Sequence, residues 1–298
     1  MKIKAGIIGG AGYTAGELIR LLVNHPEVEI MFVNSSSNAG NKITDIHGGL
    51  AGETNLTFTD CLPFEQVDVL FLCSAHGDSK KFMEANNLPS HLKIIDLSAD
   101  YRAESAQNTF VYGLPELNKD RIRQASRIAN PGCFATAIQL ALLPLAANNL
   151  LTDEVHAHAI TGSTGAGVKP AATTHFSWRD NNVSVYKAFE HQHLEEIRQS
   201  LSQLQQGFKE TINFIPIRGD FPRGIFTGIY TQCRLSSEEI RQLYQDFYRN
   251  AAFTLISDSN PDLKQVINTN KCIVYPEKHR DKIFIVSVID NLLKGASG

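Results

Sequence analysis

Gly9-Gly10-Ala11-Gly12-Tyr13-Thr14-Ala15-Gly16 is the stretch that decides the fold, because of what stands on either side of it. Before it, Ile3 to Ile8 is a short apolar run typical of a buried strand. After it, Glu17 to Val23 has helical apolar spacing, and Val28 to Val33 supplies a second strand. Strand, glycine turn, helix and strand in this order predict the opening of a βαβ unit.

The pattern continues through the first 130 residues. Val67 to Leu72 and Leu92 to Leu97 are two more candidates for buried strands. Strands that alternate with helices build a parallel, doubly wound sheet of the Rossmann type. We therefore expect a dinucleotide-binding domain over residues 1–130.

After residue 130 the pattern changes to longer strands with fewer helices. A long helix is expected from Phe134 to Asn148 and further helices from about Leu194 to Gln205 and Glu238 to Tyr248. Strands are expected at Val155–Thr161, Ile225–Thr231 and Ile283–Ile289, among others. This mixture predicts an α+β catalytic and oligomerisation domain over 131–290, built on a mixed, largely antiparallel sheet. Residues 291–298 are expected to return to the first domain.

The composition is that of a globular protein and excludes several classes of partner. The chain is 43% hydrophobic and 20% charged, and its net charge of −3 offers no general attraction to nucleic acid or anionic membrane. No stretch approaches the ~20 apolar residues of a spanning helix. The five cysteines are scattered and never spaced as CxxC, which argues against a disulfide framework. We expect a cytoplasmic protein.

The glycine turn and the end of the second strand indicate which nucleotide binds. Gly9 suits the tight turn and Gly12 the close approach of the pyrophosphate, while Ala15 takes the third position, where alanine is tolerated. NAD enzymes usually place an acidic residue after the second strand, but Asn34 to Asn38 contains only Asn and Ser. These small donors favour NADP, although an ordinary polar surface loop would look much the same.

Cys133 is the candidate nucleophile, because Pro131-Gly132 places it at the start of the long apolar helix. A helix N-terminus lowers the pKa of a thiol and favours the reactive thiolate. The remaining cysteines are interpreted as small buried hydrophobic residues. They are Cys61, Cys73, Cys233 and Cys272.

A thiolate nucleophile usually needs an acid/base partner, and two His-x-His pairs compete for that role. His156 and His158 lie in a predicted strand and would also fit as partly buried sheet residues. His191 and His193 stand at a loop-to-helix junction, which suits functional groups better. Both pairs could instead be metal ligands, although the strong metal-binding motifs are absent.

A second glycine-rich loop, Thr161 to Lys169, follows the predicted strand at Val155–Thr161. Its backbone N–H groups and the Lys169 side chain could bind phosphate or shape the cofactor pocket. The alternative is a flexible connection without a ligand, and spacing alone does not choose between the two.

Motifs spread over the whole chain resemble one known family. Ile95 to Arg102, Tyr112 to Asn118 and Ile128 to Cys133 follow the first glycine turn. Later matches are Gly162 to Gly167, His191-Gln192-His193, Pro222-Arg223-Gly224 and Val288 to Ala296. In this order they resemble the N-acetyl-gamma-glutamyl-phosphate reductases of arginine biosynthesis, which are similar to aspartate-semialdehyde dehydrogenases.

The resemblance implies a role for each matching residue. Cys133 looks like the family's nucleophile, His191 or His193 like its acid/base, and Glu196 like the acidic residue just inside the following helix. The positions implied near the NADP(H) cofactor are Gly9, Gly12, Tyr13, Thr14, Ser36, Ser37, Gly162 and Asn291. The candidates for holding the substrate's carboxylate or phosphate are Ser98, Arg102, Asn130 and Lys169.

The chain departs from the family at two places. Members often carry an arginine among the serines after the second strand, and because none is present, Lys42 is expected to serve the 2′-phosphate. Members also continue past the position of Gly298 into a helix that packs on the nucleotide domain, so we expect a longer natural chain.

The resemblance implies a thioester reaction on a small acyl phosphate. The Cys133 thiolate attacks the acyl phosphate, inorganic phosphate leaves, and hydride reduces the thioester to the aldehyde. A homodimer or homotetramer is expected, and the N-acyl group stays open between acetyl, succinyl and a carrier adduct. Three rivals remain: a reductase of aspartyl phosphate, a metal-dependent hydrolase that uses the His-x-His pairs, and a nucleotide-sensing protein with an inert thiol.

Overall fold

The computed structural model describes residues 1–298 and divides into two units. The first unit consists of Met1–Pro131 together with Ser297–Gly298, and the second of Gly132–Ala296. The chain returns to the first unit only at its last two residues, because the segment before them is hydrogen-bonded within the second. There, the Asp290 carboxylate accepts from the main-chain N–H groups of Asn268 and Leu292.

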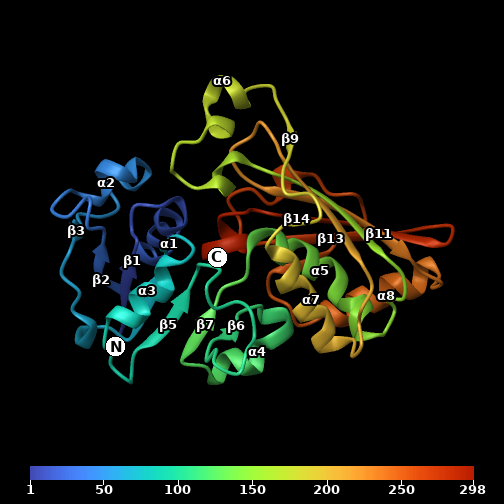
Figure 1. The fold of residues 1–298 in the computed structure, drawn as a ribbon, viewed down its shortest axis with the longest axis horizontal. Helices are drawn as coiled ribbons and strands as arrows, with labels where there is room; N and C mark the ends of the chain where they lie inside the picture. The colour runs from blue at the N-terminus through green and yellow to red at the C-terminus, as the bar shows by residue number, and fades with distance from the viewer. The chain divides into compact units, whose positions relative to one another are not determined.

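The first unit is built on a seven-stranded sheet in the order β3-β2-β1-β4-β5-β7-β6, and every neighbouring pair is parallel (Figure 1). Its strands are β1 (Ile3–Ile8), β2 (Val28–Asn34), β3 (Phe58–Thr59), β4 (Val69–Leu72), β5 (Lys93–Asp96), β6 (Val111–Tyr112) and β7 (Arg127–Ala129). Its helices are α1 (Tyr13–Val23), α2 (Ile43–Ile46), α3 (Asp78–Ala85) and α4 (Pro115–Gln124). The predicted Rossmann-like sheet is confirmed.

Both faces of this sheet are covered, which explains why its strands read as continuous apolar runs. Successive side chains of β1 enter different cores. Ile7 packs with Leu18 and Ile19 of α1, whereas Ile8 belongs to a second cluster that includes Leu70 and is bordered by Phe82 of α3. The carboxyl ends of the strands are therefore free to carry the turns that matter for ligand binding.

The second unit has a mixed sheet of seven strands in the order β12-β13-β14-β11-β8-β10-β9. They are β8 (Val155–Thr161), β9 (Ser184–Val185), β10 (Ile212–Arg218), β11 (Ile225–Gln232), β12 (Thr254–Ile256), β13 (Cys272–His279) and β14 (Lys282–Ile289). Four of the six pairings are antiparallel, and the pairs β12–β13 and β8–β10 are parallel. This confirms the predicted mixed, largely antiparallel sheet.

Helix α5 (Cys133–Ala147) is the centre of the second unit's core. It packs against the strands β11, β13 and β14 and against the helices α7 (His193–Leu204) and α8 (Ser237–Tyr248). Every residue from Phe134 to Ala146 is buried, as expected of a helix that is apolar all round. Its first residue, Cys133, is therefore placed by the most buried element of the unit.

A long excursion between β8 and α7 contains the short helix α6 (Phe176–Arg179) and the edge strand β9. In Figure 1 this excursion extends from one end of the second sheet. None of the chain's helices is both long enough and apolar enough to cross a bilayer.

Candidate active site

The turn between β1 and α1 has the geometry of a phosphate site. Gly9 has φ +75°, and a Cβ at this residue would lie 2.9 Å from the Cys73 backbone, so only glycine fits. Gly12 is the N-cap of α1, and a Cβ added to it would have no other atom within 4 Å. No acidic residue and no side-chain cap occupies this helix start. An N-terminus of this kind attracts an anion such as a dinucleotide pyrophosphate.

His47, which the sequence analysis did not single out, supports this turn. Its Nε2 lies 2.7 Å from the Gly10 carbonyl oxygen, within hydrogen-bond distance. Its ring lies against Gly16 of α1, where a Cβ would be 2.6 Å from Nδ1. The last glycine of the opening motif therefore makes room for a histidine that holds the turn.

The turn after β2 is polar and carries no carboxylate. Ser36 is exposed, and the amide of Asn38 donates to the hydroxyls of Ser35, at 2.9 Å, and Ser37, at 3.1 Å. Tyr13 is 44% exposed at the start of α1, and the Thr14 carbonyl accepts from Ser297. With no acidic residue to repel it, this turn fits a 2′-phosphate.

Three predicted substrate residues lie together at the carboxyl ends of β5 and β7. The Ser98 hydroxyl donates to Asp96 at 2.7 Å, and burial raises the pKa of this carboxyl group. Arg102 donates from Nε to the Asn130 carbonyl at 2.8 Å and from a terminal nitrogen to the Leu97 carbonyl at 3.0 Å. These bonds fix the Arg102 guanidinium at the edge of the first sheet.

In the second unit, Cys133 begins α5 and is half-buried. The residue before it is the N-cap, Gly132, whose N–H donates to Glu196 Oε2 at 2.8 Å. The other oxygen of Glu196 lies 3.8 Å from His193 Nε2. The first turn of a helix leaves N–H groups outside the helical ladder, and α5 has no acidic residue there.

His193 is seated directly against Gly132. A Cβ at Gly132 would lie only 2.4 Å from His193 Nε2, so the imidazole occupies the space that any side chain would need. His193 and Glu196 start α7 three residues apart and therefore share one face of the helix. Because α7 packs on α5, this face is brought to the residue next to Cys133.

His191 is also buried but has a different environment. Its Nδ1 accepts the main-chain N–H of His193 at 3.2 Å, and the two rings are 4.5 Å apart. Burial, followed by the charges of His193 and Lys187, lowers the pKa of His191 to about 3. His191 is therefore neutral at physiological pH.

Gly162 and Asn291 are joined through the second glycine-rich loop. A Cβ at Gly162 would meet the Pro222 carbonyl at 2.4 Å. The Asn291 side chain accepts from the Gly224 N–H at 2.6 Å and donates to Thr164 at 3.1 Å, so it fastens the loop to the end of β14. Lys169 lies farther along, is exposed, and is not part of the cluster around Cys133.

Three residues that the sequence analysis missed complete this cluster. Gly295 lies on Cys133, since a Cβ there would be 2.9 Å from the cysteine Cβ. Arg218, the last residue of β10, stacks its guanidinium carbon 4.8 Å over the Tyr186 ring. Burial raises the pKa of Tyr186 to about 12, and the Cys133 charge adds to that effect. The sequence offered one signal for Arg218, which is that a charged residue stands at the end of the apolar strand β10.

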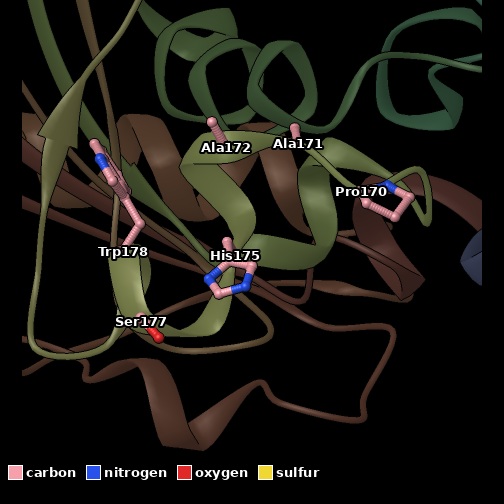
Figure 2. Close-up of a pocket in the computed structure, with 6 residues that line it drawn as sticks. All are labelled: Pro170, Ala171, Ala172, His175, Ser177 and Trp178. Carbon is pink, nitrogen blue, oxygen red and sulfur yellow. The ribbon is translucent and has the colours of Figure 1, made fainter.

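The other histidines form no comparable site. His156 stacks on Tyr230 with 4.7 Å between ring centroids, on the sheet face opposite α5. No group of three or more His, Cys, Asp or Glu side chains is arranged to hold a metal. A cavity of about 630 Å³ lies in the excursion between β8 and α7, lined by residues such as His175 and Trp178 (Figure 2). It contains none of the predicted site residues.

Family models match both parts of the chain. A semialdehyde dehydrogenase NAD binding domain matches residues 4–125, and a semialdehyde dehydrogenase dimerisation domain matches residues 133–291. The second model begins at Cys133 and ends at Asn291.

Curated relatives match over almost the whole length. Proteins named N-acetyl-gamma-glutamyl-phosphate reductase are 66% identical in Bacteroides fragilis and 65% identical in Bacteroides thetaiotaomicron. A third, from Flavobacterium johnsoniae, is 54% identical. In each case the match covers 99% of this chain and 92% of the relative.

Solved structures share the fold at low identity. Aspartate semialdehyde dehydrogenase II from Vibrio cholerae has a TM-score of 0.75 at 14% identity, over 100% of this chain and 95% of that one. The Candida albicans enzyme, solved with NADP, has a TM-score of 0.74 at 17% identity and covers 100% and 96%.

Proposed function

This chain belongs to the N-acetyl-gamma-glutamyl-phosphate reductase family, and we propose that it reduces an N-acyl-gamma-glutamyl phosphate through a Cys133 thioester. The products are the N-acyl-glutamate semialdehyde and inorganic phosphate, a step of arginine biosynthesis. One observation carries the proposal. Cys133 opens a buried helix beside a His193–Glu196 pair that is held against Gly132.

The first unit is proposed to bind NADP(H), which supplies the hydride. The open N-terminus of α1 suits the pyrophosphate, with Gly9 and Gly12 leaving room for the backbone to approach it. The acid-free turn that carries Ser36 and Ser37 favours NADP over NAD. Lys42, exposed at the start of α2, is the cation nearest to this turn in the sequence.

Cys133 is proposed as the nucleophile because of its position at the helix start. The partial positive charge there stabilises a thiolate, and the N–H groups of the first turn can stabilise an oxyanion on the attacked carbonyl. None of the other cysteines occupies the first residue of a helix.

His193 is the better candidate for the acid/base, although the sequence left the choice open. His191 resists protonation, because burial holds its pKa far below neutrality. His193 lies against Gly132 and has the Glu196 carboxylate nearby to stabilise its protonated form. His191 then helps to position His193, because its Nδ1 accepts the main-chain N–H of that residue.

The chemistry proceeds in balanced steps. His193 takes the Cys133 proton, the thiolate attacks the acyl carbon, and the bond to phosphate breaks with the proton going to the leaving group. Hydride then adds to the thioester carbon, giving a thiohemiacetal oxyanion on Cys133. Collapse breaks the carbon–sulfur bond, releases the aldehyde and leaves the thiolate, which is reprotonated from solvent through His193.

The remaining assignments extend the same proposal. Ser98, Arg102, Asn130 and Lys169 are proposed to hold the substrate's anionic groups, with Arg102 the most constrained of the four. The second unit is proposed to pair with a second copy of the chain, as a homodimer or homotetramer. Because a catalytic thiol must stay reduced, we infer a cytoplasmic location.

The test is an assay in the reverse direction. Phosphate-dependent NADP reduction is measured with N-acetyl- and N-succinyl-glutamate semialdehydes and with aspartate semialdehyde. Cys133→Ser should abolish turnover and leave NADPH binding, followed by fluorescence, intact. Cys61→Ser is the matched control, because Cys61 lies in the first unit and is exposed rather than buried as the sequence analysis expected.

Three outcomes would contradict the proposal. Turnover by Cys133→Ser would exclude the thioester. A strong preference for aspartate semialdehyde would assign the chain to the related reductases. Activity that needs no nucleotide and is lost on chelation would favour the hydrolase.

A further inference from the structure

His47 is a half-buried histidine of the first unit whose main chain is fixed without the help of its side chain. Its N–H donates to the Ile43 carbonyl at 2.8 Å, and its carbonyl accepts the N–H of Leu50 at 2.9 Å. Ile43 and Leu50 are themselves buried in the same cluster as Ile7 of β1 and Ile19 of α1. The imidazole is therefore not needed to close this turn, and its role lies at the residues that it reaches.

The imidazole reaches the glycine turn, 37 residues earlier in the sequence. Its Nε2 lies 2.7 Å from the Gly10 carbonyl oxygen, and because a carbonyl oxygen only accepts, Nε2 carries the proton and donates. No other group of the chain donates to this carbonyl. The ring lies against Gly16, where a Cβ would be 2.6 Å from Nδ1 and 2.8 Å from Cε1. The imidazole is thus held between the turn and α1.

This hydrogen bond decides which way the peptide between Gly10 and Ala11 faces. The C=O and N–H of a trans peptide point in opposite directions, and the chain has no cis peptide bond. With the carbonyl turned toward His47, the Ala11 N–H points away from His47. It has no acceptor in the chain, and neither has the N–H of Gly12. Two adjacent N–H groups in this state can cradle an anion.

The opposite orientation of this peptide would harm phosphate binding. Gly10 has no Cβ, so the peptide that follows it rotates at little steric cost. The rotated peptide would present the Gly10 carbonyl, the negative end of its dipole, where the Ala11 N–H now points. A carbonyl there would repel a pyrophosphate, whereas the N–H attracts it. A donor fixed on the other side of the turn keeps the favourable orientation, and His47 is that donor.

We propose that His47 is a positioning residue for NADP(H), which holds the peptide between Gly10 and Ala11 so that its N–H donates to the cofactor's pyrophosphate. The proposal rests on the NADP(H) binding argued above. It assigns part of the affinity for the pyrophosphate to a side chain outside the glycine motif. His47 acts through the peptide and touches no cofactor atom itself, so its loss should affect only ligands that carry the pyrophosphate.

The experiment measures two dissociation constants by fluorescence, one for NADPH and one for adenosine 2′-monophosphate as its competitor. The competitor has the adenosine and the 2′-phosphate but no pyrophosphate. His47→Met removes the donor and keeps a side chain of similar size. It should weaken NADPH binding about tenfold, as expected for one lost hydrogen bond, and leave the affinity for adenosine 2′-monophosphate within about twofold. His47→Gln, whose amide nitrogen can take the place of Nε2, should recover most of the NADPH affinity.

Gly16→Ala tests the same contact from the other side of the ring. The added Cβ would lie 2.6 Å from Nδ1, so the ring must shift, and NADPH affinity should fall although His47 is present. Combined with His47→Met, the same substitution should have little further effect, because the ring that it displaces is gone. His91→Met, at an exposed histidine of the same unit, is the matched control and should leave both dissociation constants unchanged.

The contrary results differ from one another. A folded His47→Met protein that binds NADPH as tightly as the wild type would overturn the proposal. So would an equal loss of affinity for both ligands, or a failure of His47→Gln to restore binding, because either would indicate a loosened domain rather than a misplaced peptide. A wild type that binds no NADPH would instead remove the cofactor assignment itself. Thermal unfolding shows whether each variant folds, and Gly16→Ala keeps the test available if His47→Met does not.

Discussion

Gly132 controls how closely His193 and Glu196, the proposed acid/base pair, approach Cys133, the proposed nucleophile. Its missing side chain is the space in which His193 Nε2 lies, and its N–H is the donor that Glu196 accepts. We expect Gly132→Ala to displace the imidazole and lower kcat by about 100-fold, since displacements near 1 Å have effects of that size. Steady-state kinetics of the reverse reaction would measure this.

Gly48→Ala is the matched control, because a Cβ at Gly48 meets nothing within 4 Å. NADPH binding should be the same in both variants and in the wild type. If the Gly132→Ala enzyme keeps the wild-type kcat, catalysis does not require the His193 imidazole to lie against residue 132.

The buried His191 predicts a dependence of stability on pH. Its folded pKa is about 3 against an ordinary value of 6.5, so the unfolded chain binds a proton more readily. The stabilising effect of a neutral His191 is present above pH 6.5 and is lost as the pH falls toward 3. The free energy of unfolding should drop by up to about 1.4 kcal/mol per pH unit in this window from this group alone.

The measurement is urea unfolding between pH 7 and pH 4 for the wild type and for His191→Phe. Other groups contribute equally to both proteins, so the difference between the two curves isolates His191. If the unfolding free energies of the two proteins fall in parallel with pH, His191 is protonated as readily in the folded protein as in the unfolded one.

At this scale the sequence singled out Cys133, the proposed nucleophile, more readily than the residues around it. Cys133 was recognisable because Pro131-Gly132 and the apolar run mark a helix start. His191 and His193 were indistinguishable, since only the packing of α7 on α5 makes one of them touch Gly132. Arg218 and Gly295 are far from Cys133 along the chain, and no local pattern connects them to it.

At the scale of elements, α5 contains a proline that removes one of its backbone hydrogen bonds, and a side chain of the neighbouring helix α8 supplies a replacement. Pro144 has no N–H, so the Leu140 carbonyl lacks its helical donor. The Tyr248 hydroxyl supplies one at 2.5 Å, and the Tyr244 hydroxyl donates to Ala141 at 2.6 Å. Tyr248→Phe should lower the free energy of unfolding by about 1–2 kcal/mol, because it leaves a buried acceptor unsatisfied.

Chemical denaturation would test this, with Tyr230→Phe as the control. Tyr230 makes its contact through its ring, which stacks on His156. If both substitutions have the same effect, the Tyr248 hydroxyl does not support α5.

The elements that sequence could predict are the long ones. Val155–Thr161 matches β8, and the helix expected at Phe134–Asn148 is α5, displaced by one residue at each end. The two- and three-residue strands β3, β6, β7, β9 and β12 were not predicted. Such strands are too short to show a period, and their neighbours in the sheet determine them rather than their own residues.

For the whole molecule, the sheet of the second unit is covered by α5 on one face. On the other face Val286 and Val288 are buried against Val266, while the part formed by β8 and β10 is more open. Helix α5 packs on the covered face, where Ala157, Phe214 and Ile229 are buried. On the opposite face, His158 of β8 is exposed beside the half-buried Ile215 of β10. Because a dimerisation domain model matches this region, we expect the open part of this face, around Ile215, to pack against a second copy.

We therefore expect light scattering to give a mass of at least twice 32.9 kDa at micromolar concentration. Ile215→Glu puts a charge on the β10 part of this face, where burying it would cost several kcal/mol, so it should shift the protein to monomer. Ile46→Glu, at an exposed apolar residue of the first unit, should leave the mass unchanged. If Ile215→Glu keeps the oligomeric mass, the copies do not associate through this face. A monomeric wild type would mean that the matched domain does not pair in this chain.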